Sequence, residues 1–135
     1  MNFVYESESG ESFDDPTEND LDQLLSDLDG VGNSFAYLTR SDGSYVQVGG
    51  GPSNFTVEWR EIRHDGTFTH LKASLPGRES DERRLTIGGA SVSVRADQLL
   101  DLSLVQRIFR SFRGGVEAPK SVIRQDITAM FQESS

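Results

Sequence analysis

Residues 34–75 read SFAYLTRSDGSYVQVGGGPSNFTVEWREIRHDGTFTHLKASL, and this stretch decides the fold class. Apolar and polar residues alternate along it, which is typical of β-strands that bury one face. Asp-Gly interrupts the alternation twice, at Asp42-Gly43 and Asp65-Gly66, and this dipeptide is the strongest short-range signal for a β-hairpin. The stretch therefore predicts four antiparallel strands in two hairpins, over residues 34–40, 44–49, 54–63 and 67–75.

The length of each hairpin loop follows from the residues that it places opposite one another. A two-residue Asp-Gly loop would pair Leu38 with Gln47, whereas a three-residue loop pairs Leu38 with Val46. In the second hairpin the three-residue loop pairs Trp59 with Leu71. Because a slip of one residue would turn each apolar set to the wrong face, we predict three-residue loops with a left-handed glycine in both hairpins.

The sheet predicted in this way has two unlike faces. One face is apolar and is expected to form the core: Ala36, Leu38, Val46, Val48, Phe55, Val57, Trp59, Leu71, Ala73 and Leu75. The other, called the outer face here, mixes aromatic and charged side chains: Phe35, Tyr37, Tyr45, Gln47, Thr56, Glu58, Arg60, Ile62, Phe68, His70 and Lys72.

The composition of the outer face predicts a partner-binding surface, because aromatic rings and arginines are the usual anchors of protein interfaces. The residues predicted to bind the partner are Tyr37, Tyr45, Glu58, Arg60 and Lys72, with Asp22 of the first helix at the rim. The alternative is that the N-terminal segment or the distal helices of the chain itself cover this face.

Helices are predicted on both sides of the strand region. Thr17 is a good N-cap for a helix over residues 18–29 with a leucine stripe. Residues 85–95 alternate around Gly88-Gly89, as a small hairpin or one interrupted strand, and a longer helix capped by Asp97 or Asp101 follows. An extended stretch over residues 121–124 and a short last helix complete an α+β fold: an antiparallel sheet of four or more strands with helices packed on its apolar face.

The charge is concentrated at one end of a chain of 135 residues with a formal net charge of −9. The first 30 residues hold no Lys or Arg and ten acids: Glu6, Glu8, Glu11, Asp14, Asp15, Glu18, Asp20, Asp22, Asp27 and Asp29. We predict that residues 1–16 are an acidic, weakly ordered leader, in which Phe3-Val4-Tyr5 could add an edge strand, and that residues 17–135 form a single domain. An acidic N-terminal segment of this kind repels nucleic acid and anionic membranes and favours a basic partner.

The residues that carry chemistry favour binding over catalysis. The chain has no Cys and two His, so we expect no disulfide, metal or cofactor. The glycine-rich stretch at residues 49–53 lacks the Lys of a phosphate loop, and the paired carboxylates lie in segments expected to be mobile. With no basic signal region and no long apolar run, we expect a cytoplasmic, non-catalytic binding protein, and a small enzyme is the least favoured class.

Two blocks carry a resemblance to a known family. The first is SYVQVGGG at residues 44–51 followed by FTVEWRE at 55–61, and the second is a helix with Ile108-Phe109 that ends in FRGG at 112–115, followed by Asp126-Ile127-Thr128 and Phe131. Together they resemble immunity proteins of bacterial polymorphic toxin and contact-dependent inhibition systems, over residues 35–131. A tryptophan that often precedes the terminal block in that family is absent here, where residues 123–125 read IRQ.

The resemblance implies a small acidic protein that binds the catalytic domain of a cognate toxin and occludes its active site. Such toxins often act on nucleic acids or nucleotides, so the toxin surface is expected to be basic, and no nucleic acid or membrane is expected as a partner. A monomer or a weak homodimer fits this function. The alternative is an acidic type III secretion-type chaperone that binds an effector as a homodimer through the apolar stripe of the distal helix.

Overall fold

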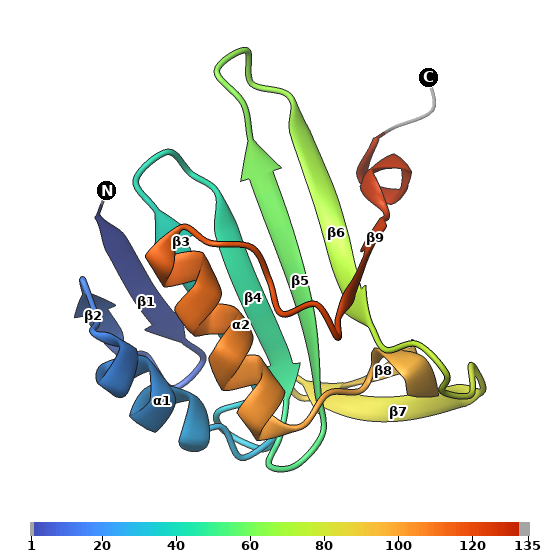
Figure 1. The fold of residues 1–135 in the computed structure, drawn as a ribbon. Helices are drawn as coiled ribbons and strands as arrows, with labels where there is room; N and C mark the ends of the chain where they lie inside the picture. Colours follow the sequence, from blue (N-terminus) through green and yellow to red (C-terminus); the bar gives the residue numbers. More distant parts are fainter. Residues whose placement is uncertain (1, 133–135) are drawn as a thin grey trace.

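The computed structural model describes residues 2–132 and has an α+β fold, as predicted (Figure 1). Seven strands form one antiparallel sheet in the order β2-β1-β3-β4-β5-β6-β9, and β7 and β8 form a separate two-stranded sheet. The strands are β1 Phe3–Ser7, β2 Ser12–Asp14, β3 Phe35–Arg40, β4 Tyr45–Gly50, β5 Phe55–Ile62, β6 Phe68–Ser74, β7 Glu82–Ile87, β8 Ala90–Arg95 and β9 Ile123–Asp126. The helices are α1 Glu18–Ser26 and α2 Leu102–Gly114, with the 3-10 turns η1 Ala96–Gln98 and η2 Thr128–Phe131.

The two hairpins have the predicted register. Leu38 pairs with Val46 in the first hairpin, and Trp59 pairs with Leu71 in the second. Both loops contain three residues. The backbone N–H of Arg40 donates a hydrogen bond to the carbonyl of Ser44 across the first loop, and that of Arg63 donates to the carbonyl of Thr67 across the second. The third residue of each loop is a glycine in the left-handed region, with φ of 93° in the first and 85° in the second, a conformation that favours glycine.

Both helices pack on the apolar face of the sheet, where they complete the core (Figure 1). Leu21 and Leu25 of α1 are fully buried there. The Thr17 cap of α1 is confirmed, with a capping box to Asp20. The helix ends at Ser26 rather than at residue 29, because the Asp29 carboxylate accepts the backbone N–H groups of the following turn.

The longer helix is capped by Asp101, whose carboxylate accepts the backbone N–H of Leu104. It ends at Gly114, and the residue that caps its C-terminus, Gly115, has a left-handed φ of 69°. Val105, Ile108 and Phe109 are fully buried against the sheet. The apolar stripe of this helix is therefore used within the core of this chain.

The prediction of a weakly ordered leader over residues 1–16 is wrong. Strand β1 lies inside the large sheet, between β2 and β3, and Tyr5 pairs with Leu38. The side chains of Phe3 and Tyr5 are 5% and 1% exposed. The acidic residues of this segment point away from the core or lie in turns, so their charge does not oppose burial of the two rings.

The hairpin of β7 and β8 turns through Gly88-Gly89 and reaches back to the outer face of the large sheet. A side chain at Gly49 would place its Cβ only 2.5 Å from Cδ1 of Ile87, so the absence of a side chain permits this close approach. The backbone N–H of Gly88 donates to Oγ of Ser34 at 2.7 Å. The hairpin tip is thus tied to the start of β3.

The C-terminal part of the chain borders the opposite end of the outer face. Strand β9 pairs with β6 as an edge strand, and it begins two residues later than the extended stretch predicted at 121–124. The predicted last helix is a single 3-10 turn, η2. This turn is held to β6 because the backbone N–H of His70 donates to Oγ1 of Thr128 at 2.9 Å.

Candidate binding face

Five of the six predicted binding residues come together on the outer face. Tyr37, Gln47, Glu58 and Lys72 form one cross-strand row, in which each pairs directly with the next. Tyr45, Arg60 and His70 form the neighbouring row. The alternation of strand residues and the two hairpin registers are sufficient to place these side chains on one face.

Five rings form a continuous aromatic row across the outer face, in the order Phe35, Tyr37, Tyr45, His70 and Phe131. Successive ring centroids are 6.1, 5.7, 6.3 and 4.2 Å apart, and the first three contacts are edge-to-face. Edge-to-face pairs at these distances are favourable contacts between rings. The row runs from the β7–β8 hairpin tip to η2 and thus joins both borders of the face.

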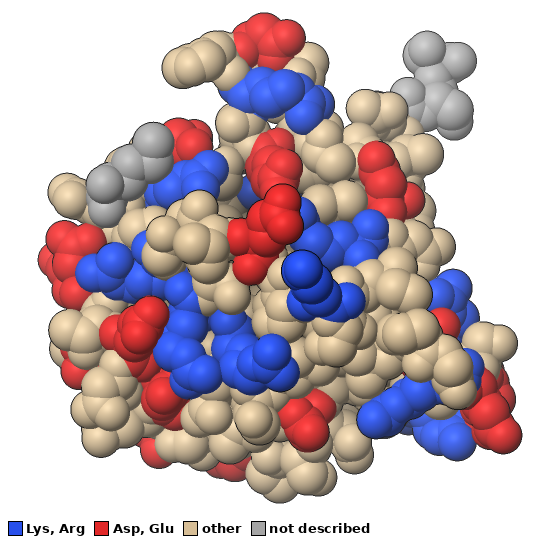
Figure 2. Space-filling view, viewed as in Figure 1, with Lys and Arg blue, Asp and Glu red and all other residues tan. Residues whose placement is uncertain are grey.

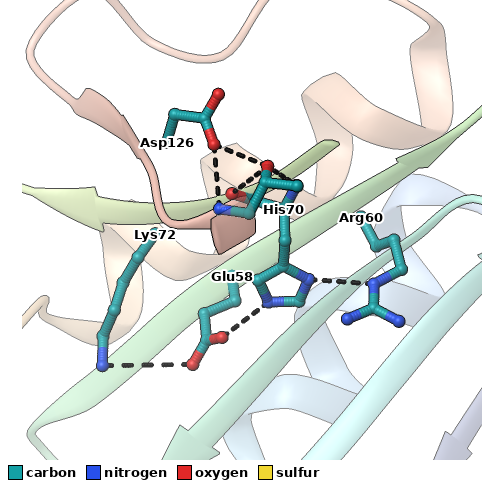
Figure 3. Close-up of polar contacts among 6 residues, drawn as sticks. Glu58, Arg60, His70, Lys72 and Asp126 are labelled. Atoms are coloured by element: carbon teal, nitrogen blue, oxygen red, sulfur yellow. Dashed lines mark hydrogen bonds and ion pairs between the residues drawn. The ribbon is translucent and has the colours of Figure 1, made fainter. Parts of the chain in front are cut away.

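A chain of polar contacts crosses the centre of the face (Figure 3). Nε of Arg60 donates to Nδ1 of His70 at 3.1 Å. Since Nδ1 accepts this bond, the proton of the imidazole lies on Nε2, which donates to Oε1 of Glu58 at 2.7 Å. Nζ of Lys72 lies 4.0 Å from the other oxygen, Oε2. His70 is 1% exposed, so this imidazole serves to orient Glu58 and Arg60.

The guanidinium of Arg60 is enclosed by aromatic rings of its own chain. It lies 4.0 Å from the ring centroid of Phe68, 4.9 Å from that of Phe131 and 5.9 Å from that of Tyr45. Within residues 2–132, the only side-chain hydrogen bond of Arg60 is the one to His70. Among the described residues, no side chain or backbone group hydrogen-bonds to its terminal amino groups, while its Nε is held by His70.

The outer face is not covered by the helices, which lie on the other side of the sheet. Tyr37 is 37% exposed, and Tyr45, Glu58, Arg60 and Lys72 are half-buried. Neither the N-terminal segment, which lies in the sheet, nor α2 covers these residues. The hairpin tip borders the face at one end, and at the other end Phe131 of η2 packs over His70 and Arg60.

Asp22 does not lie at the rim of this face, contrary to the prediction. It belongs to α1 on the opposite side of the sheet, and its carboxylate accepts from Nη1 of Arg110 in α2 at 2.7 and 2.9 Å. The helical leucine stripe of α1 directs this helix onto the core face. The acidic side of α1 consequently meets α2.

Sequence reasoning missed the two residues that border the face from outside the four central strands. Ile87 comes from the separate hairpin and Phe131 from η2. No periodicity or motif indicated that these segments return to the outer face. The register had placed His70 opposite Arg60, but its complete burial depends on Phe131.

A cavity with a volume of about 510 Å³ lies on the helix side, beside the C-terminal end of α2. Its charges are mixed, since Arg124 pairs with Glu61 at 2.7 Å and Arg63 and Glu117 also line it. Figure 2 shows this side of the molecule, where Lys and Arg side chains gather over α2 with acids between them. No single ligand charge is favoured by this cavity.

The part of the chain that the structure describes, residues 2–132, has no group of three or more His, Cys, Asp or Glu side chains that could hold a metal ion. None of its helices is long and apolar enough to span a membrane. Comparisons with protein-family models, with curated proteins and with solved structures return no significant match.

Proposed function

We propose that this protein is an immunity protein that binds the catalytic domain of a cognate bacterial toxin and occludes its active site. The observation that carries the proposal is the aromatic row on the outer face, with the guanidinium of Arg60 packed beside it. Tyr and Arg side chains dominate the binding energy of protein interfaces. Packed as they are here, they lose little conformational freedom on binding.

The charge distribution supports a basic surface on the toxin. The ten acids among the first 30 residues are attached to a folded edge of the sheet and to α1, so their field is fixed in space. A fixed acidic field accelerates association with a basic partner and disfavours nucleic acid. Screening by salt would weaken this effect.

The alternative of a homodimeric secretion chaperone has less support. It required the apolar stripe of the distal helix as a dimer surface. Val105, Ile108 and Phe109 of that stripe are fully buried within one chain. A dimer through this stripe would require α2 to leave the sheet.

The proposal is tested with the catalytic domain of the toxin encoded by the neighbouring gene. We expect co-expression of this protein to restore growth, and a complex to be measurable by calorimetry. Tyr37→Ala and Tyr45→Ala should each weaken binding by about 1–3 kcal/mol. Phe13→Ala is the matched control, because Phe13 is a 41% exposed ring on the edge strand β2. A neighbouring gene unrelated to toxins, absence of protection, or equal binding by all three variants would contradict the proposal.

A further inference from the structure

A small trough lies between the hairpin tip and the centre of the outer face. It has a volume of about 270 Å³ and is lined by Phe35, Tyr37, Gln47, Thr56, Glu58 and Ile87, among others. Pockets for drug-sized ligands measure roughly 300–1,000 Å³. The trough is therefore of a size to hold a single side chain.

Glu58 is the only charged residue among those that line the trough. Its side chain is 18% exposed, and its Oε1 accepts from His70 at 2.7 Å. Nζ of Lys72 forms an ion pair with Oε2 at 4.0 Å, a separation that exceeds hydrogen-bond distance. Glu58 lines the trough whereas Lys72 does not, and a carboxylate has more acceptor sites than the one that His70 occupies, so it can accept from a donor that enters the trough.

The aromatic walls of the trough also favour a cation. Phe35 and Tyr37 pack edge-to-face with ring centroids 6.1 Å apart. The outer face already contains one cation held against aromatic rings, because Arg60 lies over Phe68 and Phe131 while its Nε donates to His70. A second guanidinium in the trough would have aromatic rings at its side and the Glu58 carboxylate as its acceptor.

We propose that the trough binds one arginine side chain of the partner protein, with its guanidinium on the Glu58 carboxylate and against the rings of Phe35 and Tyr37. Arginine is favoured over lysine because its planar fork can donate to Glu58 and to the Gln47 amide oxygen at once. This inference rests on the proposed function, since it assigns the arginine to the basic surface of the toxin.

The test uses the protein alone and follows the Tyr37 ring resonances by NMR. The probe is N-acetyl-arginine methylamide, and the matched probe is the neutral isostere N-acetyl-citrulline methylamide. We expect saturable shifts at Tyr37 and Thr56 with the arginine probe and none with citrulline. Glu58→Gln should weaken arginine binding about tenfold or more, because the variant keeps an acceptor for His70 but loses the charge.

Glu6→Gln is the control variant, because Glu6 pairs with Tyr37 in the same cross-strand row and does not line the trough. Its affinity for the arginine probe should equal that of the native protein. Equal binding of citrulline, binding unaffected by Glu58→Gln, shifts confined to residues 2–30, or no shift at all would overturn the inference. Equal binding of N-acetyl-lysine methylamide would overturn the preference for arginine. No toxin is used, so failure here is separate from failure of the proposed function.

Discussion

The carboxylate of Glu8 accepts two hydrogen bonds from Ser34, at 2.8 Å from its backbone N–H and 2.6 Å from its hydroxyl. The same hydroxyl oxygen accepts the backbone N–H of Gly88. Ser34 is fully buried and thus joins three segments: the β1–β2 connection, the start of β3 and the tip of the β7–β8 hairpin. One wall of the trough on the outer face depends on this junction.

Ser34→Ala should release the hairpin tip from the sheet. The substitution removes the buried hydroxyl that donates to the Glu8 carboxylate and accepts from the backbone N–H of Gly88, so we expect the free energy of unfolding to fall by about 1–3 kcal/mol. Amide hydrogen exchange at Gly88 should accelerate more than that at Leu38. Ser91→Ala, at an exposed position of the same hairpin, should change neither quantity. Unchanged exchange at Gly88 would show that the hairpin is held by other contacts.

Phe3→Ala should strongly destabilise the protein, although this residue lies in the segment predicted to be a leader. The ring is 5% exposed and packs edge-to-face on Phe112 at 5.9 Å. Truncation of such a buried ring costs about 3–5 kcal/mol, which urea unfolding would measure. Phe13→Ala is the matched change on the adjacent strand and should cost less than about 1 kcal/mol, since the ring is 41% exposed. Similar small losses for both variants would mean that β1 adds little to the stability of the sheet.

The two histidines should differ sharply in their contribution to stability. His70→Ala removes a buried ring that bonds both Glu58 and Arg60, so we expect a loss of about 2–4 kcal/mol in the free energy of unfolding. His64→Ala changes an exposed loop residue and should have an effect within about 0.5 kcal/mol. Equal effects of the two substitutions would contradict the central role of His70.

Asp42 should titrate at unusually low pH. Hydrogen bonds from the Arg40 guanidinium, at 3.1 and 2.9 Å, are the main cause that lowers the pKa of this carboxyl to about 2. The pKa of Asp42 in the folded state lies below its ordinary value, so its interaction with Arg40 stabilises the folded protein when the carboxyl is ionised. This stabilisation is complete above the ordinary pKa and is lost as the pH falls through about 2.

NMR titration of the Asp42 carboxyl carbon measures this value directly. Arg40→Leu should raise the pKa toward the ordinary range. The pKa of Asp65, which Thr67 lowers in the equivalent turn of the second hairpin, should stay the same in that variant. A pKa of Asp42 that is unchanged by Arg40→Leu would assign the shift to the backbone of the turn.

The register of the central strands could be predicted from the sequence because its causes are local. An Asp-Gly turn sets the loop, and a shift of one residue would expose every apolar side chain of a strand. The same argument brought Tyr37, Tyr45, Glu58, Arg60 and Lys72 onto one face. Helix caps such as Thr17 and Asp101 are local too, since they act within one turn.

The position of β1 was decided by the tertiary structure. Its pairing with β3 joins residues far apart in the chain, for example Phe3 with Arg40. The apolar run Phe3-Val4-Tyr5 is short and is followed by acidic residues, so the composition of the segment did not indicate a strand inside the sheet. The same holds for Asp22, whose partner Arg110 lies 88 residues away. Composition indicates the charge of a segment but not the surface that the segment meets.

The borders of the candidate binding face were likewise decided only in three dimensions. Gly88 reaches Ser34 across 54 residues, and Thr128 reaches His70 across 58. These contacts depend on a glycine at position 49, which leaves room for the hairpin, and on the hydroxyl groups of Ser34 and Thr128. Single residues of this kind produce no periodic pattern in the sequence. Alternation determined which side chains share the outer face, because side chains in a strand point to its two faces in turn. Tertiary packing decided which of them are buried, because burial depends on segments that return from elsewhere in the chain.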